Sequence, residues 1–335
     1  MSLIMLVKYP SYEDAARGEL IGPSSHIGKF FRRCYKAAGR KAGLQVRPRL
    51  TSILPEPETS VEKLFTKSEV DGNAWPKCGL LGKPANPGAF SHTFERIKGA
   101  NCILAIGLAP TYLTLGQDKV TALRGTVQWS NALKCKVIPT YDLDSVYADW
   151  SLRSAFTFDI SKAIAESQYP EIRLRERILT MATDIIDIKT YFKYFDLNGS
   201  IPIAVDVETE DGQITSIAFA TSPERALVVP FWDKSRPNYS FWPEVLEPYV
   251  WSQIGNVLEG TCPKIFHNGV YDLSYIQEKH YIKVNGPIHD SMLQSHSLQP
   301  ELLKSLGHLG SLHTNESAWK MLNKTKKKDI TKSEE

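Results

Sequence analysis

The chain has 335 residues, enough for about two domains at roughly 150 residues each. Its 40 Lys and Arg residues and 37 Asp and Glu residues give a formal net charge of +3, which excludes a histone-like polycation but allows a local basic surface. With 42% hydrophobic and 23% charged residues, the composition is close to that of soluble globular proteins and excludes global disorder.

The cysteines and the N-terminal segment indicate a cytoplasmic protein. The five cysteines are widely spread and include no CxxC pair, which argues against a disulfide framework or a zinc ribbon. The apolar run at the start ends at Lys8 and Pro10, too soon for a signal sequence. No stretch approaches the roughly 18 apolar residues of a membrane span. We therefore expect a reducing cytoplasm and no membrane.

A basic helix is the first prominent element. The segment GELIGPSSHIGKFFRRCYKAAG predicts a Gly/Pro loop that opens into a helix. No acidic residue occurs from Gly28 to Leu50, where Phe30, Phe31 and Tyr35 alternate with basic residues. These basic residues are Lys29, Arg32, Arg33, Lys36, Arg40, Lys41, Arg47 and Arg49. Two interpretations stay open: a core face with a solvated opposite face, or a DNA-backbone contact in which Lys29, Arg32 and Arg33 bind substrate.

The rest of the first half alternates strands and helices. Apolar runs from Cys102 to Gly107 and from Lys136 to Tyr141 are typical of buried strands in an α/β domain. Between Ser151 and Asn198 the apolar spacing becomes helical, so we place the domain boundary there. The predicted parts are a first domain at 1–165, a helical linker at 166–182, a second domain at 183–322 and a charged tail at 323–335.

The second half begins with three strands. The segments IPIAVDVET, ITSIAFA and ALVVPF predict these strands. A helix over WPEVLEPYVWSQIGNVL, a strand KIFHN and a helix VYDLSYIQEK follow. This order is typical of an α/β domain.

Two carboxylates end the first of these strands. Asp206 and Glu208 are two residues apart, so their side chains point to the same face of the strand. Neighbouring carboxylates repel each other, and a cation that prefers oxygen ligands, Mg²⁺ or Mn²⁺, would compensate their charge. An isolated pair of this kind is more often a solvent-facing strand end.

A third carboxylate follows at a strand-to-helix junction. In FHNGVYD the strand ends at His267 and Asn268, and the helix carries Asp272. Such junctions lie at the carboxyl edge of α/β sheets, where these folds place their sites, so we expect Asp272 to face the pair on the first strand. His267 and His289 are interpreted as hydrogen-bonded neighbours rather than bases.

These motifs together resemble the DEDD 3′–5′ exonucleases, in particular the proofreading domain of family A DNA polymerases. VDVET resembles the first motif and FHNGVYD the second, while HDSMLQSHSLQPELLKSLGHLGSLHT resembles the stretch that follows in phage-type polymerases. The resemblance covers about Thr183 to Lys320 and implies a ribonuclease H-like fold with a mixed sheet.

The resemblance also implies roles for individual residues. Asp206, Glu208 and Asp272 would hold two Mg²⁺ or Mn²⁺ ions for two-metal hydrolysis of a phosphodiester. Thr209 and Asn268 would position the strand end. We interpret Asp290 as a structural residue or a neighbour that supports the metal ligands, rather than as a ligand itself.

One feature departs from this family. The fourth acid of the family lies in a later motif, YxxxD or HxxxD, and the sequence reaches Glu335 without it. Tyr275 and Asp290 lack that spacing, and no tyrosine stands four residues before Asp329. The expectation is therefore a second domain that is incomplete at its C-terminal end, with weak metal binding and poor cleavage. Any polymerase domain would follow Glu335.

The first half resembles the uracil-DNA glycosylase superfamily from about Leu20 to Trp150. The shared features are a GPxxxxGK loop and helix, a strand that ends at Gly107, an LRG turn at 123–125 and a PTY strand end at 139–141. This resemblance implies an α/β/α sandwich. Asp142 and Leu143 stand where the family has a His-Pro pair, so we expect DNA binding without base excision.

The two resemblances together are similar to the N-terminal half of certain phage replicative DNA polymerases. The leading hypothesis is an exonuclease that acts on the 3′ end of single-stranded DNA or of a primer–template, in the cytoplasm of a phage-infected bacterium. The alternatives are a DNA-binding or replisome-tethering module with an impaired nuclease site, and an active uracil glycosylase that uses Asp142. RNA stays open as a substrate, because related DEDD folds process RNA.

Overall fold

The computed structural model describes residues 2–53 and 91–316. Contacts divide the chain into two units, Met1–Leu174 with Glu301–Glu335 and Arg175–Pro300. Cys78, Asp329 and the charged tail at 323–335 lie outside the described residues. Among the residues that are described, no helix is long and apolar enough to cross a membrane.

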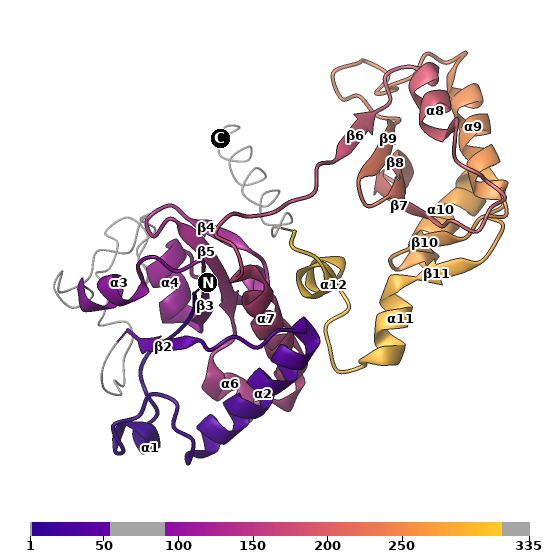
Figure 1. The fold of residues 1–335 in the computed structure, drawn as a ribbon. Coiled ribbons are helices and arrows are strands. Elements are labelled where there is room, and N and C mark those ends of the chain that lie inside the picture. The colour runs from indigo at the N-terminus through magenta and orange to yellow at the C-terminus, as the bar shows by residue number, and fades with distance from the viewer. Residues whose placement is uncertain (1, 54–90, 317–335) are drawn as a thin grey trace. The chain divides into compact units, whose positions relative to one another are not determined.

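The first unit is built on a five-stranded mixed sheet (Figure 1). The sheet has the order β2-β1-β3-β5-β4, and only β4 runs antiparallel to its neighbour. Its strands are β1 (Leu3–Val7), β2 (Arg49–Ser52), β3 (Cys102–Ile106), β4 (Gln128–Ser130) and β5 (Cys135–Thr140). Every residue of β1, β3 and β5 is buried, as is usual for parallel strands covered on both faces. The strands predicted at 102–107 and 136–141 are confirmed.

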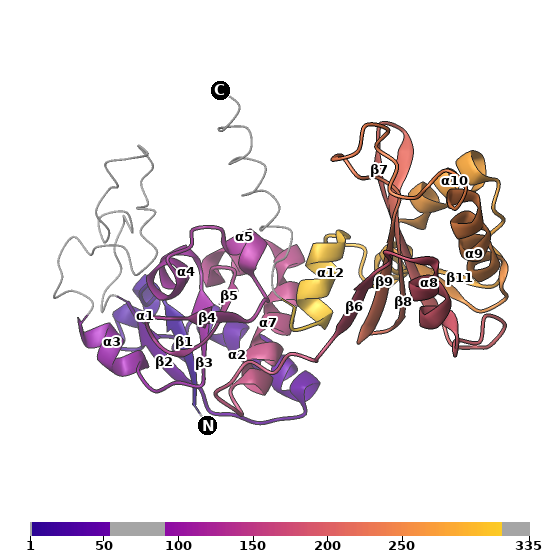
Figure 2. The same cartoon turned by 90° about the horizontal axis from the view of Figure 1, so that it is seen from above.

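Helices cover both faces of this sheet (Figure 2). Because side chains alternate along a strand, Leu3 and Met5 pack with α2 (His26–Ala42) and α7 (Arg153–Glu166). Ile4 and Leu6 pack on the other face with α3 (Ser91–Ile97) and α4 (Leu108–Leu115). The shorter elements are α1 (Tyr12–Ala15), α5 (Val120–Leu123), α6 (Leu143–Ala148) and a 3₁₀ turn at Trp150–Leu152. The first unit is therefore a three-layer α/β/α sandwich, and its relation to glycosylases stays a prediction.

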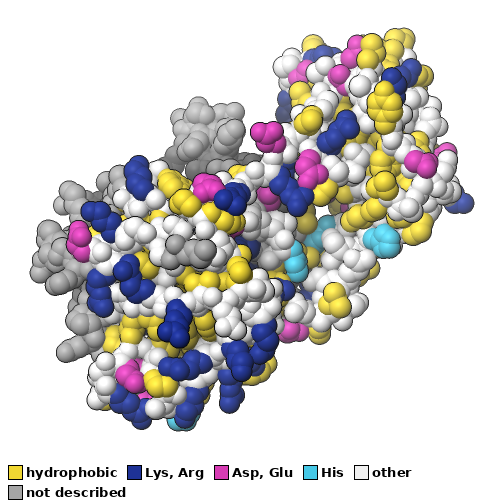
Figure 3. Space-filling view, in the orientation of Figure 1, with side chains coloured by type: hydrophobic (Ala, Val, Ile, Leu, Met, Phe, Trp, Pro, Cys, Tyr) yellow, Lys and Arg dark blue, Asp and Glu magenta, His cyan; other side chains and the backbone are white. Residues whose placement is uncertain are grey.

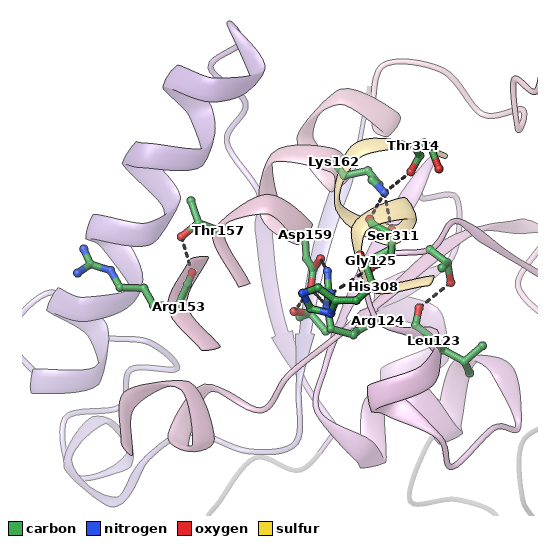
Figure 4. A network of polar contacts seen from close by, with 12 residues as sticks. Leu123, Arg124, Gly125, Arg153, Thr157, Asp159, Lys162, His308, Ser311 and Thr314 are labelled. Carbon is green, nitrogen blue, oxygen red and sulfur yellow. Dashed lines mark hydrogen bonds and ion pairs between the residues drawn. The ribbon is translucent and has the colours of Figure 1, made fainter. Parts of the chain in front are cut away.

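Helix α12 (Leu306–His313) packs against the first unit, although the predicted boundary at 322 placed it in the second domain. Leu309 and Leu312 form a small apolar cluster with Ala155 of α7. The buried Arg124 connects the two helices, because its Nε donates to Asp159 Oδ2 of α7 at 3.0 Å and its Nη1 donates to Ser311 Oγ of α12 at 3.1 Å (Figure 4). These contacts attach residues 301–316 to the first unit.

The second unit contains a six-stranded mixed sheet in the order β11-β10-β7-β8-β9-β6. Strands β7, β8 and β9 form an antiparallel meander, while β10 and β11 run parallel to β7. The strands are β6 (Ile178–Met181), β7 (Ile203–Glu210), β8 (Gln213–Ser222), β9 (Arg225–Pro230), β10 (Lys264–Phe266) and β11 (Ile288–Asp290). The helices are α8 (Ile185–Phe192), α9 (Glu247–Glu259), α10 (Gly269–His280) and α11 (Ser291–Leu298). Leaving out β6, this is the strand order of a ribonuclease H-like fold, as expected from the sequence.

The segment predicted as a helical linker at 166–182 is extended instead. Helix α7 ends at Glu166, and residues 170–177 form no helix. Residues 178–181 then form β6, which pairs in parallel with β9. The prediction of a helix was wrong because the free edge of β9 offers hydrogen-bond partners to these backbone groups, and apolar spacing over so short a segment does not separate strand from helix.

Candidate active site

Strand β7 presents the first two predicted acids on one face. Val205 and Val207 are buried in the core of the second unit. The residue that follows each of them, Asp206 and Glu208, is exposed. A register shift in the pairing of β7 with β8 falls between Glu208 and Thr209. The alternation predicted from the sequence is therefore present, and both carboxylates leave the strand on the side away from the core.

Helix α10 brings the third acid to the same strand. Asp272 lies in its first turn and is 5% exposed, and its Oδ1 accepts a hydrogen bond from the Val207 backbone N–H at 2.8 Å. Burial raises the pKa of Asp272 to about 6, and the charges of Asp206 and Asp290 add to the increase. The hydrogen bond from Val207 acts in the opposite direction and lowers this pKa. The predicted meeting of Asp272 with the end of the first strand is thus found in the structure.

The turn before α10 depends on two small residues. Asn268 has a φ of 63°, a left-handed conformation that asparagine adopts more readily than most residues. A Cβ on Gly269 would lie 2.6 Å from the Cβ of Phe266, so a side chain has no room there. These two positions let the chain turn sharply from β10 into α10 and set the direction from which Asp272 approaches β7.

Asp290 holds this turn from the neighbouring strand. Its oxygens accept hydrogen bonds from the backbone N–H groups of Gly269 at 2.8 Å and Asn268 at 3.2 Å. It also caps α11 by accepting from Met292 at 2.8 Å and Leu293 at 3.2 Å. Burial opposes its ionisation, but these backbone hydrogen bonds outweigh burial and lower the pKa of Asp290. An ionised Asp290 therefore ties the start of α10 to the start of α11.

Two hydroxyl groups lie next to the acids in the sequence, at Thr209 after Glu208 and at Tyr271 before Asp272. The hydroxyl of Thr209 is hydrogen-bonded to that of Tyr271, which precedes Asp272 on α10. The rings of Tyr271 and Tyr275 lie 5.0 Å apart. Reasoning from the sequence missed Tyr271, although it stands inside the FHNGVYD motif. A polar aromatic residue beside a candidate metal ligand was the available signal.

The remaining predicted residues take other positions. His267 Nδ1 is 3.0 Å from Ser291 Oγ, and His289 Nδ1 is 3.5 Å from Gln294 Nε2. Both histidines thus have polar neighbours, as the interpretation from the sequence expected. The cations Lys29, Arg32 and Arg33 lie exposed on α2, which belongs to the first unit.

The chemistry of the acids suits a hard divalent cation. Asp206, Glu208 and Asp272 supply only carboxylate oxygens, the ligands that Mg²⁺ and Mn²⁺ prefer. The raised pKa of Asp272 reflects burial and then neighbouring negative charge, and a bound metal ion would offset both. In the part of the chain that the structure describes, however, no three His, Cys, Asp or Glu side chains are gathered closely enough to hold a metal ion. The donor type therefore fits a metal site, whereas the three carboxylates do not converge on a single point.

Residues 182–333 match the sequence family described as 3′-5′ exonuclease. The C-terminal half of the chain contains a domain of this exonuclease family. Solved structures similar to it include Escherichia coli RNase D, with 14% identity over 42% of this chain and 34% of that chain and a TM-score of 0.31. NrnC of Brucella melitensis with bound Mg²⁺ shows 14% identity over 43% and 64%, with a TM-score of 0.27. Trypanosoma brucei RNase D in complex with RNA U12 shows 16% identity over 42% and 52%, with a TM-score of 0.26.

The chain spans about one third to two thirds of the length of these structures. No curated protein sequence matches the chain. The glycosylase resemblance of the first unit and the polymerase context of the whole chain remain predictions.

Proposed function

We propose that the chain is a metal-dependent 3′–5′ exonuclease that hydrolyses phosphodiester bonds at the 3′ end of single-stranded DNA, within phage-type DNA replication. The observation that supports it best is the burial of Asp272 against β7, where its carboxylate meets the charge of Asp206. Stability alone does not favour such an arrangement, because uncompensated carboxylates destabilise the fold. The exonuclease family match of the same residues agrees with this function.

Each residue of the site has a role in this proposal. Asp206, Glu208 and Asp272 would hold two Mg²⁺ or Mn²⁺ ions, which supply a charge clamp on the attacking and leaving oxygens of the phosphodiester. Thr209 and Asn268 would orient the 3′-terminal nucleotide. Asp290 holds the start of α10 through its hydrogen bonds to backbone amides, and so sets the position of Asp272.

The basic face of α2 supports a nucleic-acid substrate. Phe30, Phe31 and Cys34 on its buried side belong to the core of the first unit. The opposite side carries Lys29, Arg32 and Arg33, which are exposed and form no ion pair with any described residue. Figure 3 shows Lys and Arg side chains gathered over this helix. Unpaired cations along one helix favour contact with phosphates, so we propose these three residues as substrate-binding.

The experiment is digestion of a 5′-labelled single-stranded DNA oligonucleotide by the full chain with Mg²⁺ or Mn²⁺. A 3′–5′ exonuclease produces a ladder of products shortened from the 3′ end. The Asp206→Ala/Glu208→Ala variant should lose at least about 100-fold in rate, more than the loss usual for residues that only support metal ligands. Glu244→Ala/Glu259→Ala, which removes two acids of the same unit away from β7, is the matched control.

Three other outcomes are informative. Cleavage that survives in the Asp206→Ala/Glu208→Ala variant contradicts the proposal. An RNA strand of the same sequence that is degraded faster corrects the substrate class. DNA binding without cleavage supports the alternative of an impaired DNA-binding module, which the separation of the carboxylates in the described part of the chain favours.

The glycosylase alternative is tested with uracil-containing DNA. Asp142 is the N-cap of α6, two residues after β5, and forms an ion pair with Lys8 at 3.3 Å. This alternative requires abasic sites in the treated DNA, and it is excluded if none form.

A further inference from the structure

The second unit contains a pocket that the exonuclease site does not use. Its volume is about 330 Å³, within the range of pockets that hold small molecules. It lies where the turn between β7 and β8 meets the segment after β9, the start of α9 and the end of α10. Ile214, which lines it, pairs with Thr209, and Thr209 is three residues from Asp206. The pocket therefore begins roughly 10 Å along β7 from Asp206, at about 3.3 Å per residue, and one residue from Glu208.

Aromatic rings line much of this pocket. Trp251 stacks on Phe231 with ring centroids 4.2 Å apart and on His280 with centroids 3.5 Å apart. Burial lowers the pKa of His280, so this ring is a neutral aromatic surface at pH 7. Trp232 and Tyr239 form a second aromatic pair at 6.1 Å, and Tyr239 is 53% exposed. Trp251 is already stacked on two rings, so the exposed ring of Tyr239 is the surface on which a flat aromatic ligand can stack.

Polar groups of both kinds share the pocket. Gln213 and Asn238 carry amides that can donate and accept hydrogen bonds, and Glu247 supplies a carboxylate. Lys279 is exposed and forms no ion pair with a described residue. Lys279 places a positive charge at the end of α10, and Glu247 places a negative charge at the start of α9, so Lys279 is the cation of the lining that can meet a phosphate. The pocket lining therefore combines stacking surfaces, hydrogen-bonding groups and an attraction for an anion.

We propose that this pocket binds a nucleotide, with the base against the aromatic side chains and the phosphate at Lys279. A nucleobase is flat and carries both donors and acceptors along its edge, and base–aromatic stacking with a nearby cation is how proteins hold single nucleotides. The ligand has two sources, a free nucleoside monophosphate or a nucleotide within a strand. The inference rests on the proposed exonuclease function and deepens it, since both the product and the substrate of that reaction supply such a nucleotide.

Calorimetric titration in EDTA tests the pocket without cleavage. The full-length Asp206→Ala/Glu208→Ala protein is titrated with deoxyadenosine monophosphate, with deoxyadenosine and with a four-nucleotide single-stranded DNA. All three should bind. A strand that binds more tightly than the monophosphate identifies the strand as the natural source, and equal affinities identify the free nucleotide.

Two substitutions in the same background locate the binding. Tyr239 has a φ of 56°, which glycine adopts without strain, so Tyr239→Gly removes the ring and keeps the loop conformation. We expect Tyr239→Gly to weaken all three ligands by about fivefold or more, as measured for the loss of one base–aromatic stack. Lys279→Gln should weaken the monophosphate and the strand but not deoxyadenosine. Lys283→Gln, an exposed lysine outside the pocket, is the control and should change nothing.

Two results would overturn the inference. One is the absence of binding by any of the three ligands. The other is binding that both Tyr239→Gly and Lys279→Gln leave unchanged, which would place the ligand elsewhere. Because these titrations involve neither metal nor catalysis, a failure of nuclease activity leaves them unaffected, and a failure of the pocket leaves the nuclease assay unaffected.

Discussion

Individual residues of this protein include charged groups whose burial has a cost. Asp272 is buried, and burial together with neighbouring acids raises its pKa to about 6. His308 of α12 shows the opposite case, because burial and then the charge of Arg124 lower its pKa to about 4. Its Nδ1 lies 3.2 Å from Arg124 Nη1, so the ring faces the guanidinium in its neutral form. Both residues lead to predictions about stability.

Asp272→Asn should separate stability from activity. An asparagine oxygen can still accept the Val207 hydrogen bond, but the buried charge is gone. We expect the free energy of unfolding in EDTA at pH 7 to rise by about 1–3 kcal/mol, while metal-dependent cleavage is lost. Urea denaturation and the oligonucleotide assay measure the two effects. A destabilised variant would show that the carboxylate supports the fold, contrary to our interpretation.

His308 should make the first unit sensitive to acid. Its pKa falls from 6.5 to about 4 on folding, so the unfolded chain binds more protons between these pH values, and stability decreases as the pH falls through that window. The side chain is partly exposed, so we expect a loss of about 2 kcal/mol. Urea denaturation at pH 7 and pH 4.5, compared with His308→Gln, measures this loss. Equal losses in both proteins would contradict the assignment to His308.

Among the elements, α12 depends on a buried polar network. Arg124 is 1% exposed and joins Asp159 of α7 to Ser311 of α12. Lys162 Nζ adds hydrogen bonds to the carbonyl oxygens of Gly125 and Thr314, each at 2.6 Å (Figure 4). These contacts join the turn after α5, helix α7 and the segment that returns from the second unit.

Removing one member of this network should be costly. Arg124→Met leaves the Asp159 carboxylate buried without its cation, and we expect the first unit to lose about 3–5 kcal/mol of stability. Arg124→Met/Asp159→Leu should recover part of this loss, because no unpaired charge remains. Arg173→Met, which breaks an exposed pair with Glu171, is the control and should change the stability far less than Arg124→Met, because solvent screens an exposed pair. Urea denaturation measures all three, and similar losses for Arg124→Met and Arg173→Met would refute the prediction.

At the scale of the whole molecule, we expect one unit to cleave the nucleic acid and the other to bind it. The exonuclease domain carries the acids, and α2 of the first unit carries exposed cations that form no ion pair with any residue the structure describes. Arg32→Gln/Arg33→Gln should weaken binding to single-stranded DNA and reduce the slope of log affinity against log salt by about 1.4, at about 0.7 per lost phosphate contact. Fluorescence anisotropy at several salt concentrations measures this slope.

The control for this prediction removes the same number of positive charges from arginines outside α2. Arg17→Gln/Arg173→Gln also removes two arginines from the first unit, but these side chains already pair with Glu13 and Glu171. We expect this variant to keep almost the full slope. If both variants reduce the slope equally, net charge rather than the α2 surface determines DNA binding.

The local features of this protein could be predicted from its amino-acid order. The run at Cys102 and the alternation around Asp206 were predicted as strands, and both are strands, because apolar periodicity reports directly on which faces are buried. The approach of Asp272 to β7 was predicted from sheet topology, because the strand-to-helix junction in FHNGVYD lies at the carboxyl edge of the sheet, although Val207 and Asp272 are 65 residues apart. Phe30 and Phe31 of α2 are buried in the core and Tyr35 is half-buried, because an amphipathic helix has one apolar side.

Features that depend on contacts between residues far apart in the sequence could be identified only from the tertiary structure. Residues 178–181 form a strand because β9 offers a free edge, and α12 joins the first unit because Arg124 and Asp159, more than a hundred residues earlier, receive it. The nucleotide pocket likewise assembles rings from α9, α10 and the segment after β9. No local sequence pattern predicts these contacts. A short segment by itself has several conformations of nearly equal energy, and long-range packing and the pairing of buried polar groups select one of them.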